Sequence, residues 1–335
     1  MIKNVAPLLL LLFTFGCQNN PKLKATLPKE IEVQDFRGKT IGLSKPAERV
    51  ICLIESALSG IYMLEGQQQV IGISTNVYEE SLFGYYSQLD YRIAEHQLPA
   101  PGNWDLVSME QILELKPDLV IIWTSQSETI QQLENFNIPV YGVMLKSYAD
   151  VIKEIRDLGK LLGKETRVEW LIDFTQQEID KLESLKEKKH RSAYFAWPQG
   201  INHTSGTEST VNDVFNIAGV TNCCPLPDEH VSINIEHLLL WNPDLVVMWP
   251  NPRMEVTDWE KHKQINSLSA VRNQQVFELP HPFLCDLWTL KLVYAAHLIN
   301  QWAYPNTVSG LQDDYSDPFL NALYHTQIQW TDEEQ

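Results

Sequence analysis

The sequence has little positive charge. Twenty-six lysine and arginine residues stand against 43 acidic ones, so the formal net charge is −17. A chain this acidic lacks the basic surface that nucleic acids and anionic lipids require, and we expect neither as a partner. Arginine is scarce between residues 192 and 290, where only Arg253 and Arg272 occur. This scarcity disfavours a bare oxyanion or citrate as ligand, because such anions need fixed cationic donors.

Long apolar runs are also missing. The run from Val5 to Phe15 follows a positively charged start, but a bilayer span takes roughly 20 residues. Its length is typical of a secretory signal. The run ends Thr14-Phe15-Gly16-Cys17, which resembles the lipobox of bacterial lipoproteins, without the usual leucine three places before the cysteine. We predict that residues 1–17 are a signal peptide with lipidation at Cys17, which anchors the chain on the periplasmic side of the cell envelope. The alternative is an ordinary signal peptide with an incidental cysteine.

The motifs of common enzymes are absent as well. The sequence has no Gly-x-Ser-x-Gly elbow, Walker loop, His-Glu-x-x-His or Gly-x-Gly-x-x-Gly motif, and we predict no catalytic activity. The remaining cysteines, at positions 52, 223, 224 and 285, match no zinc spacing. They allow three pairings, and either buried thiols or one structural disulfide is compatible with the sequence.

An internal repeat organises the chain. Residues 109–123 align without gaps with residues 235–249, and seven of the fifteen positions are identical. Each copy begins after an N-cap residue, Ser108 or Asn234, continues as an apolar-periodic helix and stops at a Pro-Asp turn. A continuous apolar strand follows, of the kind that is buried on both faces of a parallel sheet. The repeat therefore predicts an α/β fold of two similar lobes with parallel-type sheets.

Further strands fit this scheme. We predict them at residues 49–54, 69–74, 119–123 and 140–145 in the first lobe, and at 192–197, 245–249 and 275–279 in the second. Between the lobes, residues 148–162 and 165–188 have helical periodicity, and the second helix is about 36 Å long, enough to join two lobes. The alternative is that this helix packs within one lobe. The predicted organisation is an N-terminal lobe at 33–147, connecting helices at 148–190, a C-terminal lobe at 191–300 and a helical tail at 301–335.

Several motifs carry a family resemblance. The segments 36–40, 46–51, 72–74, 115–120, 204–209, 218–222, 241–244 and 268–271 occur in the order found in ABC-transporter solute-binding proteins for ferric siderophores and cobalamin. The chain resembles this family over about residues 33–300. The resemblance implies two α/β lobes bridged by one long helix, with a ligand cleft between them. It also implies partners, namely an ABC permease dimer with its cytoplasmic ATPase, and we expect a monomeric receptor.

Candidate ligand-binding residues follow the predicted strand ends, because open parallel sheets bind ligands beyond the carboxyl ends of their strands. Aromatic rings at these ends suit large conjugated or apolar-faced ligands. It is equally compatible with the sequence that the tryptophans cap the lobe cores and that the histidines are ordinary surface residues. The candidates are Glu55, Ser56, Tyr78, Trp104, Trp123, Trp197, His203, His230, Trp249, His281 and Trp288.

Two glutamates occupy the same place in the two repeats. Glu110 and Glu236 each stand second in their helix, and the resemblance implies that one glutamate per lobe contacts arginines of the permease. The alternative is that both carboxylates serve only the positive ends of their own helix dipoles.

These observations predict a lipoprotein receptor that binds an iron complex or a corrinoid and delivers it to a permease. We expect no resident cofactor, although the ligand itself would contain iron or cobalt. A receptor for free zinc or manganese is a second hypothesis, with His203, His230, His281 and Asp286 as possible ligands at wide spacing. The sequence is also compatible with a haem- or molybdate-binding receptor and with a surface lipoprotein that serves no transporter.

Overall fold

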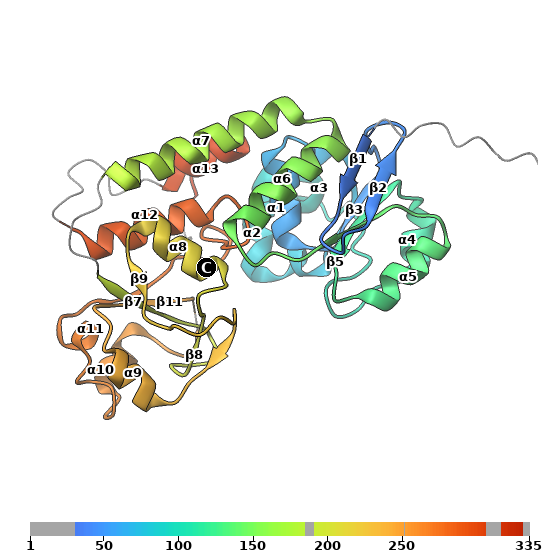
Figure 1. Cartoon of the computed structure of the whole chain (residues 1–335). Helices are drawn as coiled ribbons and strands as arrows, with labels where there is room; N and C mark the ends of the chain where they lie inside the picture. Colours follow the sequence, from blue (N-terminus) through green and yellow to red (C-terminus); the bar gives the residue numbers. More distant parts are fainter. Residues whose placement is uncertain (1–30, 185–190, 251, 306–315, 331–335) are drawn as a thin grey trace, which may run out of the picture.

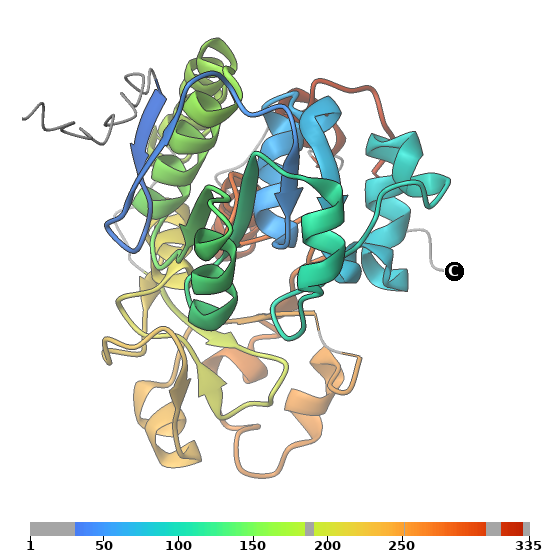
Figure 2. The same cartoon turned by 90° about the vertical axis from the view of Figure 1, so that its right-hand side faces the viewer.

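The computed structural model describes residues 31–184, 191–250, 252–305 and 316–330. Within these residues each lobe contains a four-stranded parallel sheet (Figures 1 and 2). The first sheet has the order β4-β3-β5-β6 and the second β12-β11-β7-β9. The strands are β3 (Val50–Cys52), β4 (Val70–Ile73), β5 (Leu119–Trp123), β6 (Val140–Val143), β7 (Ser192–Ala196), β9 (Thr221–Asn222), β11 (Leu245–Met248) and β12 (Val276–Glu278).

The two sheets share the strand pair that the repeat predicts. In the first lobe β5 lies beside β3, the first strand of its sheet along the chain, and in the second lobe β11 lies beside β7, the first strand there. Both pairs are parallel. On their other sides, β3 pairs with β4 and β7 pairs with β9. The sheets differ here in strand length, because β4 has four residues and β9 has only two.

The repeat is reproduced as a pair of equivalent helices and strands. Helices α4 (Met109–Leu115) and α9 (Ile235–Trp241) begin after the N-caps Ser108 and Asn234, whose side chains accept backbone hydrogen bonds. Both helices end in a left-handed residue, Lys116 with φ 47° and Asn242 with φ 43°. A proline follows each time and prevents the helix from continuing. The chain then enters β5 or β11.

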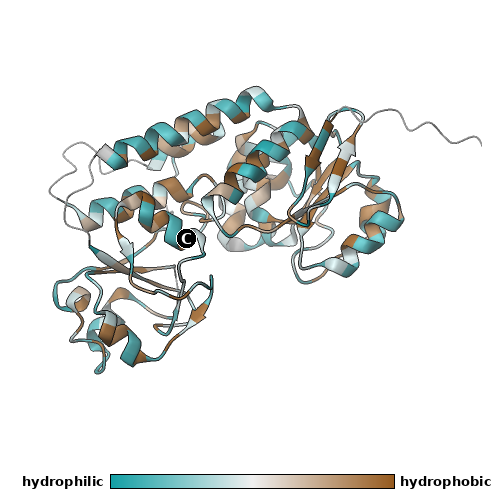
Figure 3. Ribbon diagram, viewed as in Figure 1, coloured by the Kyte–Doolittle hydropathy of each residue, from teal (hydrophilic) through white to brown (hydrophobic). Residues whose placement is uncertain are grey.

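The inner faces of the two sheets belong to one continuous hydrophobic core. Alternate residues of the strands point into it, for example Val50 of β3 and Leu245 of β11, and α7 (Glu165–Ser184) contributes Leu171 and Leu182. In Figure 1, α7 extends across both lobes, and Figure 3 shows hydrophilic and hydrophobic residues along its length. The other inner helices are α1 (Glu55–Met63), α6 (Tyr148–Leu162), α8 (Thr210–Ala218), α12 (Leu292–Ala303) and α13 (Ser316–Tyr324). Because the lobes share a core, large hinge motions would expose buried apolar surface.

The outer faces of the sheets have separate cores. In the first lobe, Ile51 and Val120 pack with Ile112 of α4. In the second lobe, Val246 and Met248 pack with Leu238 of α9. The other outer helices are α5 (Ser127–Asn135), α10 (Val256–Lys261) and α11 (Ser269–Arg272). The helices that begin the two repeats thus lie on the side of each sheet that faces away from the shared core.

Short elements complete the fold. A hairpin pairs β1 (Ile31–Gln34) with β2 (Thr40–Leu43), and β8 (His203–Thr204) pairs with β10 (Val231–Ser232). After β4 come the 3₁₀ turn η2 (Thr75–Tyr78), α2 (Glu80–Leu89) and α3 (Tyr91–Ala94), and η1 (Gln67–Gln69) precedes β4.

The predicted strands are confirmed, with ends that differ by one or two residues. Strand β9 and both antiparallel pairs were not predicted, because segments of two to four residues carry too little periodicity. The predicted helix over 165–188 is observed to Ser184, and residues 185–190 lie outside the described residues, as do the predicted signal and Cys17. None of the described helices is long and apolar enough to cross a bilayer.

Candidate site between the two lobes

Three indoles converge at the carboxyl ends of the strands of the second lobe. The ring of Trp197 lies 5.5 Å from that of Trp249 and is stacked on Trp288 at 6.0 Å, and Trp249 and Trp288 are also 6.0 Å apart. Trp197 is buried and donates a hydrogen bond from Nε1 to Ser205 Oγ at 2.8 Å. Trp249 and Trp288 are partly exposed. Trp197 therefore supports the two indoles that a ligand can reach.

Polar groups border this indole cluster. The ring of His230 is exposed and lies 5.4 Å from Trp197. Glu229 Oε1 accepts a hydrogen bond from Trp288 Nε1 at 3.3 Å. The carbonyl of His203 accepts from the amide of Trp197, and its Nδ1 is 3.2 Å from Ser232 Oγ. The structure thus brings the ring of His230 to the indoles, whereas His203 contacts Trp197 through its main-chain carbonyl, and the hypothesis of ordinary surface histidines stays open.

Glu55 occupies the corresponding edge of the first lobe. It begins α1 shortly after β3, and its Oε1 accepts a hydrogen bond from Ser74 Oγ at the end of β4, at 2.5 Å. Tyr86 donates to the Glu55 carbonyl at 2.6 Å. Burial raises the pKa of Glu55, and the charge of Asp286 raises it further. Ser56, its neighbour, is buried and presents little surface to a ligand.

The two lobes touch beside Glu55. The ring of Tyr85, on α2, lies 4.7 Å from His281 and is stacked on Phe283 at 4.6 Å. His281 Nδ1 accepts a hydrogen bond from the amide of Phe283. The amine of Lys291 is fully buried on this ring, 3.8 Å from the centre of Phe283. Burial lowers the pKa of Lys291 to about 8, while Asp286 acts in the opposite direction.

Sequence reasoning missed Phe283, Asp286 and Lys291 as a group. His281 was singled out because it follows a strand, and Asp286 only as a possible zinc ligand. Lys291 stands among apolar residues at the start of α12, where the pattern by itself indicates a core position. The signal in the sequence that could have identified a buried charge was the position of Lys291 inside an apolar run.

The remaining candidates lie apart from the indole cluster. Trp123 is partly buried at the end of β5 and packs against the shared core. Tyr78 contacts His96 at 4.7 Å and donates a hydrogen bond to the Leu98 carbonyl, both within the first lobe. Trp104 is 61% exposed in the loop before α4. Ligand contact by these three residues stays a prediction.

The described residues hold no group of three or more metal-ligating side chains, and the four cysteines at positions 52, 223, 224 and 285 are free thiols. Burial raises the pKa of the Cys52 and Cys223 thiols. Of the two alternatives that the sequence left open, the structure has free thiols and no disulfide among these four cysteines.

Glu110 and Glu236 are both exposed in the first turns of α4 and α9. Each helix precedes the strand that it covers and runs back along it. The helix N-termini therefore lie at the same edge of their sheets as the strand ends that carry Trp123 and Trp249. One carboxylate per lobe accordingly borders the region between the lobes.

Residues 50–282 match the model of the periplasmic binding protein family. The chain belongs to this family. It is 21% identical to an uncharacterised ABC transporter substrate-binding lipoprotein, YvrC of Bacillus subtilis, over 87% of this chain and 93% of that protein. It is 22% identical to a vitamin B12-binding protein of Vibrio parahaemolyticus, over 70% of this chain and 82% of that protein. The solved structure of Haemophilus influenzae MolA bound to molybdate has a TM-score of 0.74 at 18% identity and covers 89% of this chain and 99% of that one.

As a periplasmic binding protein of the cobalamin and iron-complex type, the chain is a substrate-binding protein of an ABC importer and not an enzyme. Such proteins act outside the cytoplasm together with a permease and an ATPase. The two-lobed α/β fold predicted from the repeat is confirmed by the two parallel sheets and by the structural neighbours.

Proposed function

We propose that this periplasmic binding protein captures a metal complex with a broad conjugated or apolar face, either an iron complex of the siderophore type or a corrinoid. The indole cluster of Trp197, Trp249 and Trp288 supports the proposal, because flat rings gain most from contact with such a face. In this proposal the ligand lies between the indoles of the second lobe and the Glu55 edge of the first.

The charges bordering the proposed site favour a neutral or cationic ligand. Glu55, Glu229 and Asp286 supply carboxyl groups, whereas Lys291, the cation that acts on Asp286, is buried against Phe283. Carboxyl groups disfavour a bare oxyanion, which needs fixed cationic donors, and Arg253 and Arg272 are the only arginines between residues 192 and 290. The similarity to the molybdate-bound structure therefore supports the assignment of the fold, but it does not support molybdate as the ligand of this chain.

Purification from the native host tests the ligand class. Native mass spectrometry gives the mass of the retained ligand, and the absorption spectrum separates a corrinoid, a ferric complex and haem. We expect retained cobalt or iron within an organic ligand. A colourless protein that retains only zinc or manganese, and loses it when His230 or His281 is replaced, would support the free-metal receptor instead.

We further propose that Glu110 and Glu236 contact cationic side chains of the permease. Both carboxylates are exposed, one on each lobe, and they border the region from which the ligand must leave. The double variant Glu110→Arg/Glu236→Arg is expected to abolish uptake while the ligand affinity stays that of the wild type. Normal uptake by this variant would refute the assignment.

A lipid anchor at Cys17 completes the proposal and is supported by the lipobox-like sequence. Mass spectrometry of the membrane-bound protein should show a diacylated N-terminal cysteine. The Cys17→Ser variant should appear in the soluble fraction of the envelope if the anchor is lipid.

A further inference from the structure

Large apolar side chains are exposed within four residues of both glutamates in the sequence. Leu106 is 76% exposed four residues before Glu110, and Leu240 is 80% exposed four residues after Glu236. Among the large hydrophobic side chains of the described residues, these two are the most exposed. A single exposed leucine is ordinary on a protein surface. An exposed leucine four residues from the equivalent glutamate in each lobe requires an explanation.

In the first lobe a rigid turn holds the apolar side chains in solvent. Gly102 has φ 154°, and a Cβ there would lie 2.2 Å from the Leu106 carbonyl oxygen, so no larger residue fits. The Asn103 amide donates to that same oxygen at 2.9 Å, while Asn103 Oδ1 accepts from the amide of Leu106 at 3.1 Å. Trp104 lies on this turn and is 61% exposed. We call residues 102–106 the docking turn.

The base of the docking turn is attached on both sides. The amide of Thr75 donates to the Gly102 carbonyl at 2.9 Å, and the amide of Ser108 donates to the Pro101 carbonyl at 2.7 Å. These bonds fix the turn to the end of β4 and to the start of α4. The backbone of the turn is therefore already ordered in the folded protein. Little further conformational entropy is lost when a partner binds, as expected of a preorganised contact surface.

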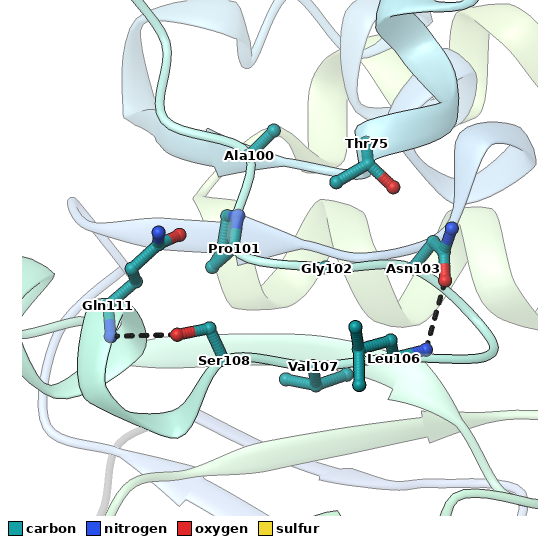
Figure 4. Close-up of a pocket in the computed structure, with 9 residues that line it drawn as sticks. All are labelled: Thr75, Ala100, Pro101, Gly102, Asn103, Leu106, Val107, Ser108 and Gln111. Carbon is teal, nitrogen blue, oxygen red and sulfur yellow. Dashed lines mark hydrogen bonds between the residues drawn. The ribbon is translucent and has the colours of Figure 1, made fainter.

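A cavity of about 380 Å³ lies against the docking turn (Figure 4). Pro101, Leu106 and Val107 supply apolar lining, and Thr75 and Gln111 line it as well. Gln111 follows Glu110 in α4, so the cavity reaches the helix turn that carries the exposed carboxylate, although Glu110 itself does not line it. A partner that brings a cation to Glu110 places its neighbouring side chains at this cavity.

In the second lobe the apolar side chains lie on the helix itself. Leu239 and Leu240 stand three and four residues after Glu236 in α9, which places them on the same helix face as the carboxylate. Both are exposed, whereas Leu238 points into the outer core. Each lobe thus presents a carboxylate with adjacent apolar side chains, but the two lobes use different segments to do so.

We propose that the docking turn with its cavity, and the Leu239–Leu240 pair, form the apolar part of the surface that binds the permease. The proposed partner segment is an extracytoplasmic loop that carries a basic residue beside an apolar one, the basic residue for the glutamate and the apolar one for the cavity or for Leu240. This inference rests on the proposed contacts of Glu110 and Glu236 with the permease, and it assigns Trp104 to docking instead of ligand contact.

The test measures binding of the ligand-free protein to its cognate permease and ATPase in lipid nanodiscs by biolayer interferometry. Leu106→Asn and Leu240→Asn are each expected to weaken binding by about tenfold or more. Phe136→Asn is the matched control, because Phe136 is 57% exposed at the end of α5 and lies outside the proposed surface. Thermal unfolding by circular dichroism confirms that the variants fold like the wild type.

The cavity is tested separately with Gln111→Phe, which fills it from the rim, against Gln131→Phe on α5. Weaker permease binding of the first variant alone supports the cavity as a receptor for a partner side chain. If both leucine variants and Gln111→Phe bind like the wild type while Glu110→Arg/Glu236→Arg does not bind, the apolar surface is refuted and the importer function stands. If the double arginine variant also binds normally, the glutamate contacts of the proposed function fail as well.

Discussion

Asp118 and Asp244 have the same structural role in the two lobes. Asp118 accepts backbone hydrogen bonds from Glu48 and Arg49 at 2.9 Å each, just before β3. Asp244 Oδ2 accepts from the amide of Ser192 at 2.9 Å and from its hydroxyl at 3.1 Å, at the start of β7. The Pro-Asp turn of the repeat therefore ends a helix, and its aspartate also holds the start of the first strand of its lobe by hydrogen bonds.

Replacing these aspartates should destabilise the fold. Asp118→Asn and Asp244→Asn each exchange a charged acceptor for a group with one acceptor oxygen, and we expect each to lower the free energy of unfolding by about 1–3 kcal/mol. Urea unfolding followed by circular dichroism measures the loss. Asp173→Asn, on helix α7, is the control and should change stability little. Equal stability of all three variants would contradict the proposed role.

The indole cluster should determine ligand affinity. Trp249→Ala and Trp288→Ala each remove a partly exposed ring, and we expect each to weaken binding of the purified native ligand by at least about tenfold, or about 1.4 kcal/mol. Isothermal titration calorimetry measures this affinity. Trp170→Ala is the control, because Trp170 is 44% exposed on α7, where it stacks on Phe174. Unchanged affinity of both cluster variants would place the ligand elsewhere.

Glu154 makes stability depend on pH. Burial raises the pKa of Glu154 from 4.5 to about 8, with Asp286 and Asp157 acting in the same direction and Lys153 against them. Between pH 4.5 and about pH 8 the carboxyl group of Glu154 is ionised in the unfolded chain but still protonated in the folded chain. The contribution of this residue to the free energy of unfolding therefore falls as the pH rises. Glu154→Gln has no proton to lose.

The free energy of unfolding of Glu154→Gln minus that of the wild type should therefore increase from pH 5 to pH 8. Urea unfolding at each pH measures both proteins, and using the difference cancels contributions from groups such as His297, whose pKa burial lowers to about 4. A difference that stays constant over this range would show that Glu154 is ionised in the folded protein.

Lys116 offers a stabilising substitution. It adopts φ 47° at the end of α4, a conformation that asparagine tolerates better than lysine and that Asn242 adopts in the other lobe. Lys116→Asn should raise the free energy of unfolding by up to about 1 kcal/mol. Lys160→Asn, within helix α6, should instead lower it by about half that amount, because asparagine is the poorer helix former. The opposite signs, measured by urea unfolding, distinguish the left-handed cap from a general effect of asparagine.

Much of the fold could be predicted because its signals are local. The helix period, the Pro-Asp stops and the apolar strands recur in both copies of the repeat, and each copy supports the interpretation of the other. The site was predicted only in outline. Strand ends singled out Trp197, Trp249 and His281 together with Trp123 and Tyr78, and no local pattern indicates which of these side chains meet in the folded protein.

The sequence by itself determined that the chain is a duplicated α/β protein with one glutamate at the start of each repeat, since helix period, caps and turns act over a few residues. Only the tertiary structure decided that three distant indoles meet, that Phe283 of one lobe packs on Tyr85 of the other beside a buried lysine, and that Leu106 stays in solvent. These relationships arise from packing between segments far apart in the chain, and an apolar residue has the same local pattern whether a neighbour covers it or not.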